Sequence, residues 1–264
     1  MVWLEIGLAI AIGYLLGSIS FPGIAIRLFA SDEQKGVIQH PSTQSEGESY
    51  EPMYGAYSTN RIWGPKVGIG ISLLDMLKVA LPMWIFKVYL FPTEYYYLLV
   101  SVAGVFGHNW PVFFKFKGGR GAAVTIGSLF VIDWLGPIAV IPLGTILGLL
   151  VLRDAGLTYL GFTVIMFPWL WFRFFDPILL LWVLGVDIAL YLSIIPDIKS
   201  VRRIEKEKGS ELADEAVNEL TPGTREMRRL VDRIDALGNV KYVISLLGLL
   251  ILVVIFWYLP LLPF

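Results

Sequence analysis

The stretch best suited to chemistry is "GHNWPVFFKFKGGRGAAVTIG", residues 107–127, where polar and basic groups surround glycines between two apolar segments. The polar and basic residues are His108, Asn109, Lys115, Lys117 and Arg120, and the loop glycines are Gly118, Gly119 and Gly121. Glycines let a backbone approach a ligand closely. A loop that leads into a helix N-terminus presents unpaired N–H groups to an anion, and arginine can clamp a phosphate through two hydrogen bonds. The stretch predicts a phosphate or carboxylate site, although a basic topology signal with turn glycines has the same composition.

The rest of the chain has the composition of a membrane protein. Of its 264 residues 56% are hydrophobic and 16% are charged, whereas soluble domains carry about 25% charged residues. Residues 6–26 and 242–264 contain no Asp, Glu, Lys or Arg, and each stretch is long enough to cross a bilayer. The first is too long for the apolar core of a signal peptide. We therefore expect an all-α, polytopic integral membrane helical bundle.

Seven apolar segments are expected to be helical, because a backbone in lipid must satisfy its own hydrogen bonds. They are residues 4–29, 67–91, 95–114, 122–152, 156–174, 177–195 and 240–262. Polar residues fill 31–66, 115–121 and 196–239. The pattern predicts a single membrane domain over 1–264, with 31–66 as the first cytoplasmic loop, 115–121 as a glycine-rich basic loop and 196–239 as a second large cytoplasmic loop.

Basic residues crowd all three polar segments, which favours their location on the cytoplasmic side of the cell (inner) membrane, with the N-terminus outside. Residues 122–195 then begin and end on the same side, yet they contain three apolar runs. We expect one of these runs to be a half-span or an in-plane helix. Arg173 and Asp176 beside Pro177 mark a candidate break.

The last polar segment ends in a predicted amphipathic helix over residues 221–238. Its apolar residues recur at helical spacing and are Met227, Leu230, Val231, Ile234 and Leu237. Arginines occupy the other faces, so we expect this helix to lie on the anionic leaflet. The chain has no cysteine and two histidines, which excludes disulfides and thiolate chemistry and disfavours a metal site.

Three segments resemble the PlsY family of acyl-phosphate:glycerol-3-phosphate acyltransferases. Residues 107–127 closely resemble the family's second motif, G-H-x-F-P-x-F-x-x-F-K-G-G-K-G-x-A-T. "GYLLGSISFP", residues 13–22, resembles its first-helix signature, and residues 64–82 resemble its second helix, with Asp75 and Lys78 where the family has D-x-x-K. The resemblance covers about the first half of the chain, and beyond residue 130 only the hydrophobic pattern agrees. Residues 240–264 form a C-terminal span additional to the family plan.

The resemblance implies transfer of a fatty acyl group from acyl phosphate to the 1-hydroxyl of glycerol 3-phosphate, which gives lysophosphatidate. It implies these two substrates and membrane lipids as partners, and no metal, cofactor or nucleic acid. The expected phosphate-binding residues are Lys117, Gly118, Gly119, Arg120 and Gly121, with Lys115 and Arg203 as second choices. We expect supporting roles for His108, Asn109, Asp75 and Lys78. For Asp75 and Lys78 a purely structural ion pair is an equal alternative.

Two motifs depart from the family. The first loop of the family reads G-S-G-N-x-G-A-T-N-x-x-R, whereas residues 50–61 read "YEPMYGAYSTNR". Arg61 matches, but Glu51 stands where the family has serine, and we expect Arg61 and Glu51 to be catalytic, with Glu51 as a general base. In the third motif Asp197 replaces a histidine. These changes leave open a catalytically impaired relative that acts as a membrane scaffold for phospholipids or phosphate esters. A transporter is disfavoured, because no two corresponding broken helices mark repeats.

Overall fold

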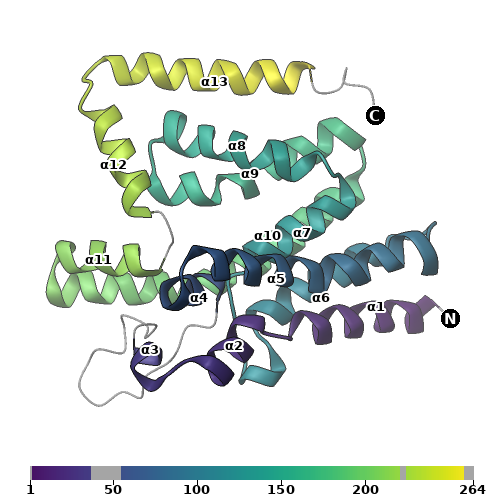
Figure 1. The fold of residues 1–264 in the computed structure, drawn as a ribbon. Coiled ribbons are helices and arrows are strands. Elements are labelled where there is room, and N and C mark those ends of the chain that lie inside the picture. The colour runs from purple at the N-terminus through teal and green to yellow at the C-terminus, as the bar shows by residue number, and fades with distance from the viewer. Residues whose placement is uncertain (1, 37–54, 221–223, 259–264) are drawn as a thin grey trace. The chain divides into compact units, whose positions relative to one another are not determined.

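The computed structural model describes residues 2–36, 55–220 and 224–258, which form helices joined by short turns, with no strand among them. Figure 1 shows the order of these helices along the chain. The chain divides into two compact units. The first comprises Met1–Ile132 and Gly185–Ala216, and the second comprises Asp133–Leu184 and Val217–Phe264.

The first unit contains the segments that resemble the family. Its elements are α1 (Val2–Gly17), α2 (Phe21–Phe29), α3 (Asp32–Gly36), α4 (Ala56–Trp63), α5 (Pro65–Ile85), the π-helical turn η2 (Phe86–Leu90), α6 (Tyr96–Asn109), the 3-10 turn η3 (Val112–Phe114) and α7 (Ala122–Ile132). The part of α10 (Pro177–Lys208) from Gly185 onward and most of α11 (Ser210–Leu220) also belong to this unit.

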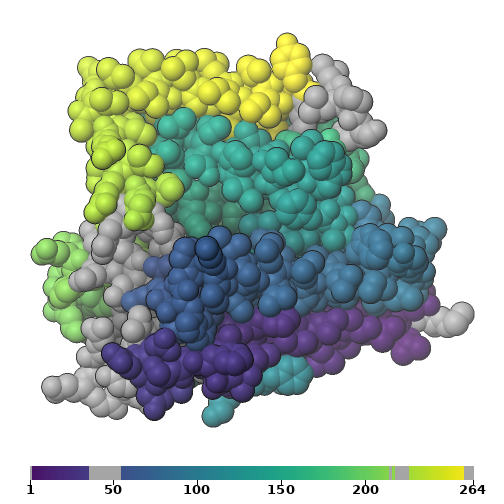
Figure 2. All heavy atoms as spheres, viewed as in Figure 1, coloured from purple at the N-terminus to yellow at the C-terminus, as the bar shows by residue number. Residues whose placement is uncertain are grey.

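Small residues bring α1 and α6 close together, and the two helices lie side by side in Figure 1. Gly13 and Gly17 of α1 face the α6 backbone so closely that a Cβ atom on either glycine would overlap the carbonyl oxygen of Val100 or Gly104. This four-residue spacing of glycines is typical of tightly packed membrane helices, in which the backbones themselves make the contact. The first-helix signature therefore has a packing role. The side chains of α1 (purple) also lie against those of α5 (blue) in Figure 2.

A substitution at this contact should destabilise the protein. We expect Gly17→Val to lower the unfolding free energy by about 1–3 kcal/mol, which is the usual effect of overpacking. The thermal midpoint in detergent should fall accordingly. Gly7→Val on the same helix is the matched control, because Gly7 has no atom within 4 Å of its Cβ position. An equal midpoint for the two variants would contradict the close packing of α1 on α6.

The first apolar run, expected as one segment over 4–29, is two helices with a bend between Gly17 and Phe21. Ser20 caps α2, since its hydroxyl accepts a hydrogen bond from the Gly23 N–H at 3.1 Å. This bend leaves the carbonyl of Ile19 outside the helical ladder, and the ammonium group of Lys78 donates to it at 2.7 Å. The bend is thus tied directly to a charged residue of α5.

The helix that follows the glycine-rich loop is short. α7 has 11 residues and a length of about 16 Å, well under the roughly 30 Å of a bilayer core. Its C-terminal carbonyls would be costly to leave unsatisfied in an apolar setting. Lys87 of η2 donates to the carbonyls of Val131 at 2.6 Å and Ile132 at 3.4 Å. A half-buried ammonium group therefore caps a half-length helix.

The second unit consists of α8 (Gly136–Ile146), the π-helical turn η4 (Leu147–Leu152), α9 (Ala155–Phe174), the beginning of α10, α12 (Thr224–Asp235) and α13 (Val240–Tyr258). Asp133, at the start of this unit, is buried against α9. Its carboxylate forms an ion pair with Arg173, whose Nε lies 2.7 Å away, and accepts a hydrogen bond from the Trp169 indole at 2.9 Å. Arg153 at the end of η4 pairs with Asp235 at 3.1 Å.

The structure places breaks in 122–195 at two positions. α9 ends at Phe174 and α10 begins at Pro177, as the break beside Pro177 predicts. A second break near Asp133 divides the run 122–152, which was expected as one apolar segment, into α7 and α8. The predicted amphipathic helix is α12, whose Val231 is buried while Leu230 is 38% exposed. The location of α12 on the membrane surface stays a prediction.

Candidate active site

The glycine-rich loop, residues 115–121, is folded onto the C-terminal end of α6. Lys115 and Phe116 adopt positive φ angles of 53° and 60°, and Gly121 has φ 79°. The Gly119 N–H donates to the His108 carbonyl at 3.1 Å. A Cβ atom at Gly118 would overlap that same carbonyl. The glycines are therefore needed for the loop to pack on α6, in addition to any role in contacting a ligand.

His108 connects this loop to α5. A Cβ atom at Gly119 would overlap the Nε2 of the His108 ring. On the opposite side of the ring, Nδ1 lies 2.9 Å from the Lys78 ammonium. Because an ammonium group has only donors, Nδ1 accepts this hydrogen bond and Nε2 carries the ring proton on the side of the loop. The imidazole is thus fixed between α5 and the glycine-rich loop.

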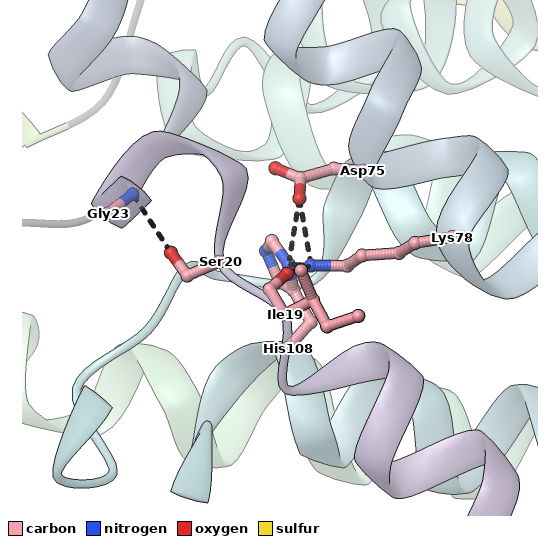
Figure 3. A network of polar contacts seen from close by, with 6 residues as sticks. All are labelled: Ile19, Ser20, Gly23, Asp75, Lys78 and His108. Atoms are coloured by element: carbon pink, nitrogen blue, oxygen red, sulfur yellow. Dashed lines mark hydrogen bonds and ion pairs between the residues drawn. The ribbon is translucent and has the colours of Figure 1, made fainter. Parts of the chain in front are cut away.

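Lys78 is the centre of a buried polar network that joins three helical segments (Figure 3). Its ammonium lies 2.8 Å from the Asp75 carboxylate, and the two side chains are 3% and 1% exposed. The Asp75 carboxylate is also 3.7 Å from His108 Nδ1. A buried charge must be paired and hydrogen-bonded to be tolerated. Here Asp75, the Ile19 carbonyl and His108 together satisfy Lys78.

Asn109 anchors α10 to the same end of α6. Its Nδ2 donates to the carbonyl of Ala189 at 2.8 Å. Its Oδ1 is buried and has no hydrogen-bond partner within the described part of the chain. The hydroxyl of Thr125, in the first turn of α7, is likewise buried and unpartnered there. Buried polar atoms without partners are uncommon in folded proteins, so these two mark the start of α7 as a place where a polar ligand could bond. Thr125 was missed in the sequence, where it has no distinguishing pattern.

Arg120 of the loop forms an ion pair with Asp197 of α10. The arginine side chain is 39% exposed and that of the aspartate is 12% exposed. The sequence marked Asp197 only as a replacement for a histidine, and a partner 77 residues away cannot be read from the pattern. Lys115 and Lys117 project exposed side chains from the same loop. The loop therefore carries three cationic groups, and Asp197 supplies a carboxylate partner to Arg120.

This arrangement of loop, histidine and buried ion pair occurs in a chain that matches a known family over most of its length. Residues 7–205 match the family model described as glycerol-3-phosphate acyltransferase. The chain belongs to this family, the PlsY family. The match continues past residue 130, so the family relationship extends beyond the half in which the sequence motifs are recognisable.

Curated relatives agree with this assignment. The chain is 36% identical over 123 residues to the glycerol-3-phosphate acyltransferase of Pasteurella multocida, with 47% of this chain and 55% of that protein covered. It is 35% identical over 126 residues to the glycerol-3-phosphate acyltransferase of Shigella flexneri, with the same coverage. The matched part thus spans about half the length of these relatives.

The fold agrees as well. A crystal structure of PlsY, an integral membrane glycerol 3-phosphate acyltransferase, in its glycerol 3-phosphate form has a TM-score of 0.58 to this chain at 24% identity. The match covers 75% of this chain and 92% of that one. A lysophosphatidic acid form gives the same TM-score at 22% identity. When α1 is counted with α2, α5 with η2 and α6 with η3, six helical spans of the described residues are long and apolar enough to cross a bilayer. This PlsY-family chain is therefore a multi-pass membrane protein.

Other elements place the remaining predicted site residues. Arg61 lies on α4, which packs on α5 and α2, and its Nη1 is buried without a hydrogen-bond partner among the described residues. Arg203 lies on an exposed part of α10. It lines a shallow basic depression with Lys199, Arg202, Lys206 and Glu207. Glu51 falls outside the described residues, so its role stays a prediction.

Proposed function

We propose that this protein transfers an acyl group from acyl phosphate to the 1-hydroxyl of glycerol 3-phosphate. The observation that carries the proposal is the glycine-rich loop, which is seated on His108 and leads directly into α7. The loop holds Lys117 and Arg120 beside the N-terminus of a helix, where the dipole and the first amides favour a phosphate. Family membership makes glycerol 3-phosphate the natural candidate for that phosphate.

In the proposed reaction the acceptor oxygen forms a bond to the acyl carbon, and the bond from that carbon to the phosphate oxygen breaks. The products are lysophosphatidate and inorganic phosphate. Glu51 takes the hydroxyl proton as a general base. Lys117, Arg120 and Arg61 offset the repulsion between the two phosphates and stabilise the charge that develops on the carbonyl oxygen. Holding both substrates in one orientation supplies the remaining rate enhancement.

His108, Asn109, Asp75 and Lys78 act in this proposal by positioning the loop. The His108 ring packs against Gly119, and Lys78 fixes the orientation of the imidazole. The Asn109 amide holds α10 against the same site. In this proposal the protein lies in the inner membrane with its N-terminus outside, and the basic loops place the site at the cytoplasmic face.

The test is phosphate release by the purified protein in detergent. Acyl phosphate is supplied with and without glycerol 3-phosphate, and release that depends on the acceptor supports the transferase. Lys117→Met should raise the KM for glycerol 3-phosphate about tenfold, because one cation facing the phosphate is lost. Lys35→Met on α3 is the matched control and should leave KM unchanged. Release that does not depend on the acceptor would contradict the proposal.

A second function is favoured by one specific observation. Asp197 neutralises Arg120, and this weakens the cationic site that catalysis requires. A protein that binds phosphate esters without turning them over would tolerate such neutralisation and would act as a membrane scaffold. Binding of glycerol 3-phosphate without acceptor-dependent phosphate release would identify this second function.

A further inference from the structure

The ion pair between Arg120 and Asp197 places a carboxylate on a guanidinium group that the proposed function assigns to substrate phosphate. This carboxylate lies on α10, and two contacts fix the position of α10 beside the loop. Asn109 binds the backbone of α10 at Ala189, and the side chain of Leu190 lies close to Gly121 of the loop. Asp197 follows two turns later on the same helix, so its approach to Arg120 is set by the packing of α10 on α6 and the loop.

The exposure of this pair decides how easily it can open. The Arg120 side chain is 39% exposed and Asp197 is 12% exposed. Partly exposed ion pairs contribute little net stability, because water screens them and two side chains must be held still. The Asp75–Lys78 pair differs, since its side chains are 1% and 3% exposed. Breaking that pair would leave a buried charge that water cannot reach. Of these two pairs, Arg120–Asp197 is the one whose cation reaches solvent, so it exchanges partners at the smaller cost.

We propose that Asp197 is a specificity-determining residue that acts as a built-in counter-anion for Arg120. This inference rests on the proposed function. In the absence of substrate the carboxylate neutralises the guanidinium, and an arriving phosphate must displace it. The carboxylate therefore weakens the binding of anions at the loop, which is a repulsive element of the kind that sets specificity. When a phosphate-bearing product leaves, the ion pair forms again and favours its departure.

The direct test compares wild type with Asp197→Asn, which keeps the shape of the side chain and removes its charge. Isothermal titration of glycerol 3-phosphate into each protein in detergent should show about tenfold tighter binding by the variant. In the phosphate-release assay, KM and kcat should both fall, since tighter binding slows product release. Asp197→Ser should behave in the same way. Glu205→Gln, on an exposed position of the same helix, makes the same charge change and should alter neither quantity.

A double substitution distinguishes competition between Asp197 and the phosphate for Arg120 from a purely structural role of Asp197. In an Arg120→Gln background, Asp197→Asn should no longer tighten binding, because there is no guanidinium left to release. Equal affinity of wild type and Asp197→Asn, or weaker binding by the variant, would overturn this inference while leaving the proposed function in place. If Asp197→Asn increased the affinity for glycerol 3-phosphate equally with and without Arg120, the inference would also be overturned. Absence of glycerol 3-phosphate binding in both proteins would overturn the proposed function and this inference together.

Discussion

We expect the Lys78→Met variant to lose about 3–5 kcal/mol of unfolding free energy, which is the usual cost of leaving one partner of a buried ion pair alone. Lys78 holds the Asp75 carboxylate at 2.8 Å and the Ile19 carbonyl at 2.7 Å. Methionine has a similar length and no donor, so both oxygens would lose their partner. Asp75 is 1% exposed and has no solvent to replace the ammonium.

Reversible unfolding in mixed detergent micelles measures this loss. The double variant Asp75→Asn with Lys78→Met should recover most of it, because the unpaired charge is removed together with its partner. Lys35→Met is the matched control, since its pair with Asp32 lies on the surface with side chains 43% and 101% exposed. It should change stability little. Similar losses for Lys78→Met and Lys35→Met would contradict a buried network.

The same variant tests whether the network positions the loop. Without Lys78, the Nδ1 of His108 loses the donor at 2.9 Å, and the ring is free to turn away from Gly119. The double variant would restore stability without restoring that donor. Recovered stability with reduced acyltransferase activity would therefore assign Lys78 a positioning role, whereas full recovery of both would leave it a structural ion pair.

Local features of the chain were predictable from the sequence. Asp75 and Lys78 are three residues apart on one helix, which places them on the same face, and the structure confirms that they are close. The loop was recognised because lysine, arginine and glycine rarely gather between apolar runs. Membership of the PlsY family was also correctly predicted from such short-range motifs.

Features that depend on distant partners were not predictable. α7 ends at Ile132 in part because Lys87, from another element, binds its last carbonyls. The bend before α2 is tied to Lys78, and Arg120 meets Asp197 from α10. Each of these contacts joins residues more than 40 positions apart, and no local pattern specifies which polar group will be satisfied by which helix.

The interpretation of the glycines also changes. The sequence suggested that they clear space for a ligand at the backbone. In the structure, the Cβ positions of Gly118 and Gly119 are filled by His108, and the Gly119 amide already donates to the His108 carbonyl. The lack of side chains at Gly118 and Gly119 therefore first allows the loop to pack on His108. The proposed ligand site is formed next to this packed loop.

This difference leads to a strong expectation for Gly119→Ala. The new methyl group would overlap the His108 imidazole, which is buried and held by Lys78 on its other side. The loop must then shift by a few tenths of an ångström or more. A misplacement of about 1 Å can reduce catalysis a hundredfold, so we expect a fall of roughly that size in kcat/KM in the phosphate-release assay. Gly70→Ala is the control, because no atom lies within 4 Å of its Cβ position.

A His108→Ala substitution in the same background separates the two explanations for the glycine. If the methyl group acts by colliding with the imidazole, removing the ring makes room, and the double variant should be no worse than His108→Ala alone. If Gly119 instead contacts the ligand directly, the two losses should add. Additive losses would show that the backbone at Gly119 faces the substrate, and they would restore the interpretation based on the sequence.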